Sequence, residues 1–389
     1  MHNFNYYVPT DIFFGKGQIS QLPAQIKKYG SSVLLVYGGG SIKKTGIYDT
    51  VVNQMKENGI PFQELSGVEP NPRIQSVYAG VKLCREHGID VVLGVGGGSS
   101  IDCAKACGAR IARPRKSLDK MKGLLKIHKK LPTLIAIPTT AGTGSETTLA
   151  AVITDPKSHH KYPINDFCLI PRYALLDPQI TCSLPPALTA STGMDALTHA
   201  VEAYIGRSTT KQTREDALEA VSLIFENLRT AFHDGADLEA RKNMLHAAYL
   251  AGSAFTVSYV GYVHAVAHSL GGRYGTPHGL ANAVLLPYVL EAYGKAAHRK
   301  LLDLAVAAGL CDDTASPKEG AALFIQAIKD MKQEFGLKDS AIRVYGKDVP
   351  RLAYFAAQEA NPLYPVPRLF SRRELEQFYR PFVKEVIDA

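Results

Sequence analysis

Short apolar runs alternate with amphipathic stretches through the first half of the chain. Four runs predict β-strands, because each is brief, apolar and followed by turn residues: VLLVYGG (33–39), VVLGVGGGS (91–99), TLIAIPTTAGTGSE (133–146) and ALLDP (174–178). Residues 46–58 have the spacing of an amphipathic helix, and IDCAKACGARIA after the second run predicts another. Strands that alternate with helices indicate a parallel sheet covered on both faces.

The pattern changes after about Leu184, at the sequence SLPP (183–186). From Pro185 onward the chain is rich in Ala, Leu, Glu and Lys with helical spacing, and glycines interrupt it. We therefore expect an α/β domain over residues 1–184 and an all-helical domain over residues 185–389.

Composition and cysteine use narrow the class of protein. Hydrophobic residues make up 46% of the 389 residues and charged residues 21%, as in globular proteins. We find no run of 18 apolar residues and no secretory signal pattern, and the six cysteines form no CxxC pair. We therefore expect a cytoplasmic protein with reduced thiols and without a membrane partner.

One segment accounts for the net charge of +8. Residues 110–130 carry nine Lys or Arg residues against one acid, Asp119, which equals the whole excess. Such a segment can bind an anionic partner such as nucleic acid, or it can be a solvated loop and helix face. No aromatic residue is interleaved for base stacking, so we favour the solvated loop and expect no nucleic-acid partner.

The sequence GGGS occurs at 38–41 and again at 96–99, each time between a predicted strand and a predicted helix. Glycine lets the backbone approach a phosphate closely, and a helix N-terminus offers free N–H groups. Neither copy is the GxGxxG fingerprint. With TTAGTGSE (139–146) on a third such turn, they predict a nucleotide site at the carboxyl ends of the strands. The candidate residues in the two copies are Gly38, Gly39, Gly97, Gly98 and Ser99.

The second half contains candidate ligands for one divalent metal. Asp195 and His199 are spaced i, i+4 on a predicted helix, which puts both side chains on one face. His264 and His268 repeat the spacing on a second helix, which Gly271-Gly272 is expected to end, and His278 follows in TPHG. One carboxylate with several imidazoles suits Fe(II) or Zn(II). The alternative for each single histidine is a packed, hydrogen-bonded core residue.

Taken together, these segments resemble the iron-containing (group III) alcohol dehydrogenases. The shared segments span essentially the whole chain and include FFGKG (13–17), EPNP (69–72), GGGSSIDCAKA (96–106), PTTAGTGSE (138–146), LLDP (175–178), STGMDALTHAVEAY (191–204), HAVAHSLGGRYGTPHG (264–279) and NPLYPVPR (361–368). The resemblance implies a dehydroquinate synthase-like fold, with an α/β nucleotide-binding domain and an all-α metal-binding domain. We also expect a homodimer or a higher homo-oligomer.

The resemblance assigns site residues position by position. It implies four metal ligands, Asp195, His199, His264 and His278, and His268 matches a histidine beside the metal pocket. The implied cofactor contacts are Asn71, Gly97, Gly98, Ser99, Thr139, Thr140, Thr143 and Lys161.

One position departs from the strictly NAD-dependent members of the family. Those members carry an aspartate at the end of the first strand, where it would bond the adenine-ribose hydroxyls and repel a 2′-phosphate. This chain has Gly38 there, and Lys43 and Lys44 lie close downstream. We therefore expect NADP(H) to be used at least as well as NAD(H).

The resemblance implies a metal-dependent alcohol dehydrogenase or aldehyde reductase that transfers hydride between NAD(P)(H) and a small primary alcohol or aldehyde. Fe(II) is the expected metal, with Zn(II) as the alternative. His268 is the candidate catalytic residue, as a proton relay or, alternatively, as a residue that only shapes the pocket.

Other functions fit parts of the same pattern. A dehydroquinate synthase-type lyase or a glycerol dehydrogenase-type enzyme would share the fold. The lyase needs several basic groups for its substrate, and the segments beside the metal candidates offer only Arg273. A basic binding protein that uses residues 110–130 is the non-enzymatic alternative.

Overall fold

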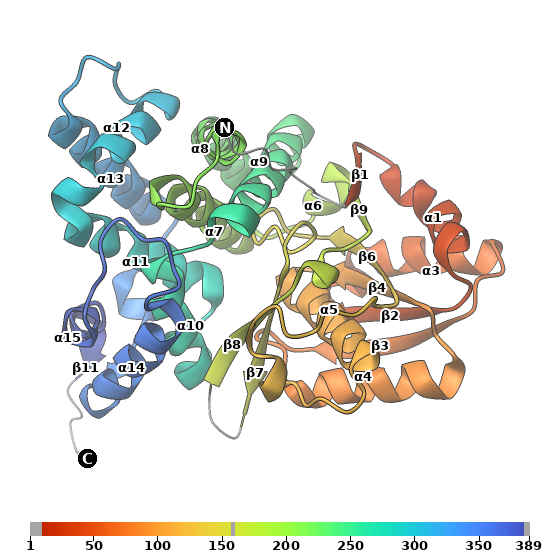
Figure 1. The fold of residues 1–389 in the computed structure, drawn as a ribbon. Coiled ribbons are helices and arrows are strands. Elements are labelled where there is room, and N and C mark those ends of the chain that lie inside the picture. Colours follow the sequence, from red (N-terminus) through yellow and green to blue (C-terminus); the bar gives the residue numbers. More distant parts are fainter. Residues whose placement is uncertain (1–9, 157–159, 385–389) are drawn as a thin grey trace, which may run out of the picture. The chain divides into compact units, whose positions relative to one another are not determined.

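A computed structural model describes residues 10–156 and 160–384 (Figure 1). The chain divides into two compact units, a sheet unit and a helical unit. The sheet unit contains the chain up to Thr139 with Ser145–Ile153 and Pro163–Ile180. The helical unit contains Thr140–Gly144, Thr154–Tyr162 and the chain from Thr181 onward. Two short segments of the N-terminal half therefore belong to the helical unit, which a single boundary near Leu184 does not describe.

A six-stranded sheet with strand order β1-β9-β6-β4-β2-β3 organises the sheet unit. Its strands are β1 (Asp11–Phe14), β2 (Val33–Gly38), β3 (Phe62–Val68), β4 (Val91–Gly96), β6 (Thr133–Pro138) and β9 (Tyr173–Leu176). Neighbouring strands pair in parallel, so the predicted parallel sheet is confirmed. The four predicted runs overlap β2, β4, β6 and β9, whereas the apolar pattern does not predict β1 and β3.

Helices cover both faces of this sheet, and they are α1 (Leu22–Tyr29), α3 (Ile47–Glu57), α4 (Ile74–His87) and α5 (Gly98–Ala112) (Figure 1). Leu35 of β2 packs in one core cluster with Val51 of α3. On the other face, α4 and α5 lie close against the sheet at two glycines. A Cβ built on Gly80 of α4 would lie 3.4 Å from Leu34, and a Cβ built on Gly94 of β4 would lie 3.1 Å from the α5 backbone. Alternate residues of the central strands thus face opposite helix layers, as period-2 geometry requires.

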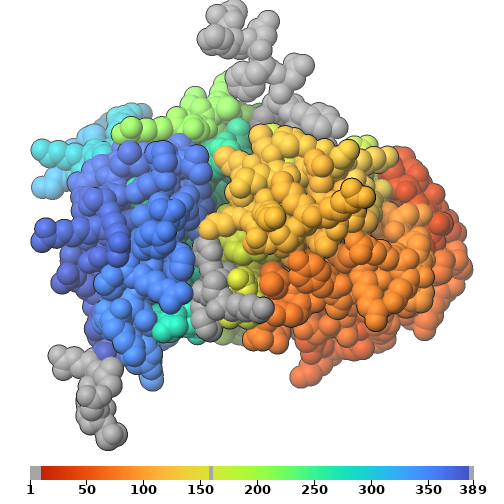
Figure 2. Space-filling view, turned by 60° about the horizontal axis from the view of Figure 1, so that its bottom comes forward, coloured from red at the N-terminus to blue at the C-terminus, as the bar shows by residue number. Residues whose placement is uncertain are grey.

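The basic segment 110–130 consists of the last turn of α5 and a surface loop of the sheet unit, within the orange-to-yellow region of Figure 2. Arg113 Nε donates to the carbonyl of Ile127 at 2.5 Å, and the Asp166 carboxylate accepts from the backbone N–H groups of Ile127 and His128. Nearby, β5 (Gly123–Leu124), β8 (His160–Asn165) and β7 (Ala150–Asp155) make a small sheet. Hydrogen bonds to its backbone groups therefore hold the loop in place, and most of its lysines and arginines face solvent.

The helical unit is built mainly from eight longer helices. They are α7 (Pro186–Ile205), α8 (Lys211–His233), α9 (Leu238–Ser258), α10 (Tyr262–Tyr274), α11 (His278–Tyr293), α12 (His298–Ala307), α13 (Pro317–Glu334) and α14 (Val349–Ala360). Side-chain caps fix several N-termini, including capping boxes at Thr210 and Ser316. The predicted all-α character of this half is confirmed, apart from the short strands β10 (Val344–Tyr345) and β11 (Val383–Lys384).

Helices α7, α10 and α11 have few polar positions and are buried on most sides. A helix that is apolar all round belongs in the interior of a domain, so any polar residue on it is carried into the core. The expected end of α10 at Gly271-Gly272 is wrong. The helix continues to Tyr274 and ends at Gly275, whose φ of 69° forms the left-handed C-cap that glycine favours.

Among the described residues, no single helix has the length and apolar composition needed to cross a membrane. One pair, α9 with α10, passes that test jointly, although it is bent by 101°.

Two acids and a lysine interact around α5 in the sheet unit: Lys105 and Glu146 are buried, and Asp102 is half-buried. Lys105 Nζ donates to the carbonyl of Thr148 at 2.7 Å and to that of Ala150 at 2.9 Å. The Asp102 carboxylate accepts from Ser145 Oγ at 2.6 Å. Glu146 lies in the same buried stretch, where loss of hydration raises the pKa of its carboxyl to about 7 despite the opposing charge of Lys105.

The raised pKa of Glu146 predicts a pH-dependent loss of stability. Between its ordinary pKa of 4.5 and about 7, the folded protein holds a proton that the unfolded chain has released, so folding becomes less favourable as pH rises through this window. Gln at this position carries no charge. We expect the stability of the parent, relative to Glu146→Gln, to fall by up to about 3 kcal/mol between pH 5 and pH 8. Urea unfolding of both proteins at the two pH values measures this, and an equal difference at both would contradict it.

Candidate functional site

Three helices bring four potential metal ligands together in the helical unit. Asp195 and His199 lie on α7, His264 lies on α10, and His278 is the first residue of α11. One ligand atom from each side chain lies within 4.8 Å of every other. Asp195, His199 and His264 are buried, and the His278 side chain is 23% exposed. The i, i+4 spacing correctly predicts that Asp195 and His199 lie on one face of a helix. That three helices come together here could not be predicted from spacing and is seen in the fold.

Two glycines let these helices approach closely. A Cβ on Gly279, next to His278, would lie 2.3 Å from the backbone oxygen of Ser191 on α7. A Cβ on Gly261, which begins α10, would lie 2.7 Å from Glu202 Oε1. Real Cβ atoms do not approach a backbone oxygen so closely, so glycine is needed at 279 for α11 to meet α7, and a Cβ at 261 would displace the Glu202 carboxylate.

Burial sets the charge state of the cluster. It lowers the pKa of His199 to about 3 and holds the pKa values of His264 and His278 well below their ordinary value. The three imidazoles are therefore neutral, which is the form that ligates metals. Burial also raises the pKa of Asp195, opposed by His199, and a bound divalent cation would favour its charged form.

Asn282 of α11 reaches the centre of the ligand cluster. Its Nδ2 donates to Asp195 Oδ1 at 2.6 Å and lies 3.0 Å from His264 Nε2 and 3.2 Å from His278 Nε2. The ring nitrogens of two helices and the carboxylate therefore point at one place. The buried Asn282 Oδ1 has no hydrogen-bond partner within the described residues, so this amide is not satisfied by the protein alone. The donor set and the unsatisfied polar atoms fit a divalent metal ion.

Glu202 orients His264 from the side away from the other ligands. Its carboxylate lies 2.6 Å from His264 Nδ1 and accepts from the backbone N–H groups of Gly261 and Val263 at 2.8 Å each. With Nδ1–H donated to Glu202, Nε2 of His264 faces the cluster. Burial raises the pKa of Glu202 to about 7, opposed first by the bond from Gly261. Sequence reasoning missed Glu202, although an acid three residues after His199 on an apolar helix was a signal.

His268 lies beside the four ligands. Its ring stacks on that of His278 with centroids 5.2 Å apart, and its Nδ1 lies 2.7 Å from Glu359 Oε1. Tyr364 donates to the same Glu359 oxygen at 2.7 Å. The structure thus places His268 next to the cluster, as the resemblance implied, and leaves both of its proposed roles open. Glu359 and Tyr364, which come from the segment around NPLYPVPR, were not predicted.

The predicted cofactor residues of the sheet unit lie at the carboxyl ends of neighbouring strands. Gly38 ends β2, Gly97 follows β4 and precedes α5, and Thr139 follows β6, with its N–H donating to the Gly96 carbonyl at 3.0 Å. Gly39 follows Gly38, Gly98 and Ser99 are the first residues of α5, and Asn71 follows β3 with a left-handed φ of 59°. This edge of a parallel sheet is where nucleotides bind in open α/β folds.

The remaining predicted cofactor residues belong to the helical unit. Thr140 and Thr143 lie in its segment Thr140–Gly144, and Lys161 lies in Thr154–Tyr162. Lys161 is buried, and its charge lowers the pKa values of His264 and His278. Lys161 therefore acts electrostatically on the metal-ligand cluster, which sequence reasoning did not foresee.

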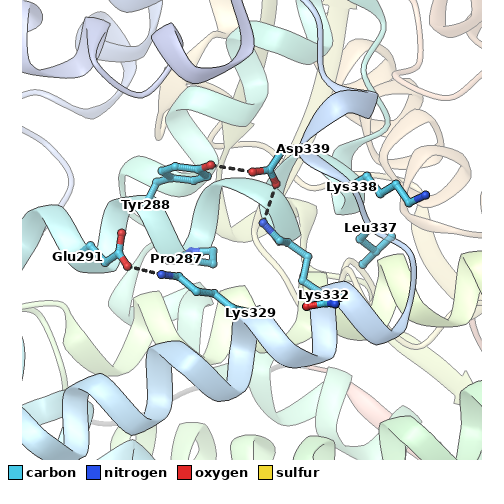
Figure 3. Close-up of a pocket in the computed structure, with 9 residues that line it drawn as sticks. Pro287, Tyr288, Glu291, Lys329, Lys332, Leu337, Lys338 and Asp339 are labelled. Atoms are coloured by element: carbon cyan, nitrogen blue, oxygen red, sulfur yellow. Dashed lines mark hydrogen bonds and ion pairs between the residues drawn. The ribbon is translucent and has the colours of Figure 1, made fainter.

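A separate hollow of about 430 Å³ in the helical unit has a different character (Figure 3). Two of its three lysines are paired with acids, because Lys329 lies 2.5 Å from Glu291 and Lys332 lies 2.6 Å from Asp339, and Lys338 also lines the hollow. Tyr288 also donates to Asp339 at 2.7 Å. The hollow contains none of the predicted site residues.

Comparison with known proteins agrees with the resemblance. Residues 9–178 match the family described as iron-containing alcohol dehydrogenase, and residues 189–383 match the C-terminal part of the Fe-containing alcohol dehydrogenase family.

Similar proteins cover nearly the whole chain. A 1,3-propanediol dehydrogenase of Citrobacter freundii is 38% identical over 381 residues, which are 97% of this chain and 98% of that protein. An NADPH-dependent butanol dehydrogenase of Clostridium saccharobutylicum is 37% identical over 88% of this chain and 86% of that protein. A crystal structure of 1,3-propanediol oxidoreductase superimposes with a TM-score of 0.91 at 37% identity and covers 98% of this chain and 100% of that chain.

The contact between Glu202 and His264 predicts an effect on metal affinity. Glu202→Gln keeps the shape of the side chain but removes its charge and turns one acceptor into a donor that faces an N–H group. We expect metal affinity to fall about 10- to 100-fold, as for other partners of metal-bound histidines. Competition with a chelator, followed by elemental analysis, measures this.

Two further variants frame that measurement. His264→Ala removes a ligand and should abolish tight binding. Glu359→Gln makes the same chemical change beside His268, outside the four ligands, and should alter metal affinity far less. Metal affinity of Glu202→Gln equal to that of the parent would reject the orienting role of Glu202.

Proposed function

Because the chain belongs to the iron-containing alcohol dehydrogenase family and is thus an NAD(P)-dependent oxidoreductase with a metal cofactor, we propose that it interconverts small primary alcohols and aldehydes, with Fe(II) and with NADP(H) used at least as well as NAD(H). The observation that carries the proposal is the convergence of four ligand atoms from three buried helices within 4.8 Å. The relatives named for 1,3-propanediol and butanol support three- and four-carbon substrates.

The metal would be held by Asp195, His199, His264 and His278, and at this position it supplies Lewis-acid stabilisation of negative charge on a substrate oxygen. The protein contributes the geometry. Burial keeps the imidazoles neutral, and Glu202 fixes His264 with Nε2 toward the cluster. Glu359 holds His268 at Nδ1, so Nε2 of that ring is left to exchange a proton with the substrate or to shape the pocket.

The proposed use of NADP(H) rests on Gly38. Its φ lies outside the left-handed region, and a Cβ there would lie 3.4 Å from the Val68 carbonyl oxygen and 3.7 Å from Ser100 Oγ. The backbone therefore does not demand glycine at this place, and a Cβ would make ordinary van der Waals contacts. What Gly38 lacks is the carboxylate that would repel a 2′-phosphate.

We also propose a cytoplasmic homodimer or higher homo-oligomer. All six cysteines are free thiols, and Cys84, Cys103 and Cys107 are buried in the sheet unit, which suits a reducing compartment. The oligomer rests on the resemblance to the family, and light scattering on the purified protein tests it.

The function is tested by reconstituting the protein with Fe(II) or Zn(II) and measuring reduction of propanal, 3-hydroxypropanal and butanal with NADPH and NADH. We expect turnover that requires the metal, with kcat/KM for NADPH at least equal to that for NADH. Absence of turnover with every aldehyde and both cofactors would reject the substrate class. A strong preference for NADH would reject the cofactor proposal alone.

Gly38→Asp should reverse cofactor choice. The new carboxylate would accept hydrogen bonds from the ribose hydroxyls and repel the 2′-phosphate. We expect the ratio of kcat/KM values to shift toward NADH by one to two orders of magnitude, roughly 1.4–2.8 kcal/mol of differential binding. kcat/KM is measured with both cofactors. An equal fall in kcat/KM for NADPH and NADH would indicate general damage to the protein and not altered cofactor selection.

A further inference from the structure

A cluster of aromatic and charged side chains adjoins Gly38 in the sheet unit. Tyr37 is the residue before Gly38 at the end of β2, Tyr48 lies on α3, and Glu64 lies on β3. Lys43 lies on the short helix α2 (Ser41–Lys44) that follows the GGGS turn, and its N–H donates to the Gly40 carbonyl at 3.1 Å. The cluster thus belongs to the same strand, turn and helix that would receive the adenosine end of the cofactor.

The Glu64 carboxylate fixes the two aromatic rings. It accepts from Tyr37 Oη at 2.5 Å and from Tyr48 Oη at 2.7 Å, one bond to each oxygen. Burial raises the pKa of Tyr37, and the bond to Glu64 raises that of Tyr48, to about 12 in each case. Both phenols are therefore neutral near pH 7, and each hydroxyl donates its hydrogen bond to the Glu64 carboxylate.

The rings in turn position the Lys43 ammonium. Its Nζ lies 4.5 Å from the Tyr48 ring centroid and 5.4 Å from that of Tyr37, within the range of cation–π attraction. Within the described parts of the chain, the ammonium makes no side-chain hydrogen bond or ion pair, and the residue is exposed. A lysine is thus held in place by contacts that use none of its three N–H donors.

We propose that Lys43 is the specificity-determining residue that binds the 2′-phosphate of NADP(H). A phosphate monoester carries close to two negative charges and offers several strong acceptors, which suit an ammonium with free donors. The aromatic platform reduces the side-chain freedom that a lysine loses on binding, since the ammonium is already placed. Gly38 would then permit the 2′-phosphate, and Lys43 would attract it. This inference rests on the proposed use of NADP(H).

The experiment compares Lys43→Met with Lys44→Met, which removes the same charge one residue along the same helix. Dissociation constants of NADPH and NADH are measured by fluorescence titration of the full-length protein. We expect Lys43→Met to raise the NADPH constant about tenfold, as for loss of one charge-assisted hydrogen bond, and to change the NADH constant much less. Lys44→Met should leave the ratio of the two constants near that of the parent.

A second pair of variants tests the aromatic platform. Tyr48→Phe keeps the ring beneath the ammonium, whereas Tyr48→Leu removes it, and we expect only the second to weaken NADPH selectively. Equal losses of NADPH in Lys43→Met and Lys44→Met would overturn the proposal in favour of general electrostatics, and an unchanged ratio in Lys43→Met would overturn it outright. A parent that binds NADH far better than NADPH would instead reject the proposed cofactor preference.

Discussion

Asp195 is 1% exposed on a helix that is buried on most sides, and a carboxylate in such surroundings must be neutralised, hydrogen-bonded or paired with a cation. The arrangement of the helical unit follows from this constraint. α7 is apolar enough to lie in the core, α10 and α11 bring imidazoles to the same carboxylate, and Gly261 and Gly279 let the helix ends approach. Burial, which makes the isolated charges unfavourable, also keeps the histidines in their metal-binding form.

Two acids next to the candidate ligands each orient a different histidine. Glu202 accepts three bonds from the start of α10 and thereby ties the helix backbone to the orientation of His264. Glu359, held by Tyr364, does the same for His268 from α14. Because each acid contacts one imidazole ring, the orientation of His264 is set by α7 and that of His268 by α14.

Much of this organisation could be predicted from the sequence, and the failures have physical reasons. Buried parallel strands such as β2 and β4 are continuous apolar runs, whereas β3, with FQELSGV, exposes several polar residues at the edge of the sheet and gives no such run. Gly271-Gly272 does not end α10, which continues to Tyr274, and Arg273 and Tyr274 beyond the two glycines both bond to the Asp348 carboxylate. Spacing and resemblance predict the four candidate ligands, but Asn282 and Glu359 reach the site through contacts between distant segments, which spacing does not encode.

The division of the chain into two units affects what recombination between related genes would exchange. The segments Thr140–Gly144 and Thr154–Tyr162 are encoded within the N-terminal half but fold with the helices. A recombination event that exchanges the first half as one piece would therefore transplant Thr143 and Lys161 into a foreign helical unit, where Lys161 would meet metal ligands that it did not evolve beside. If β2 and the turn after it bind the adenosine end of the cofactor, as proposed, a crossover upstream of β6 would exchange those residues while Thr140–Gly144 and Thr154–Tyr162 stay with their own helices.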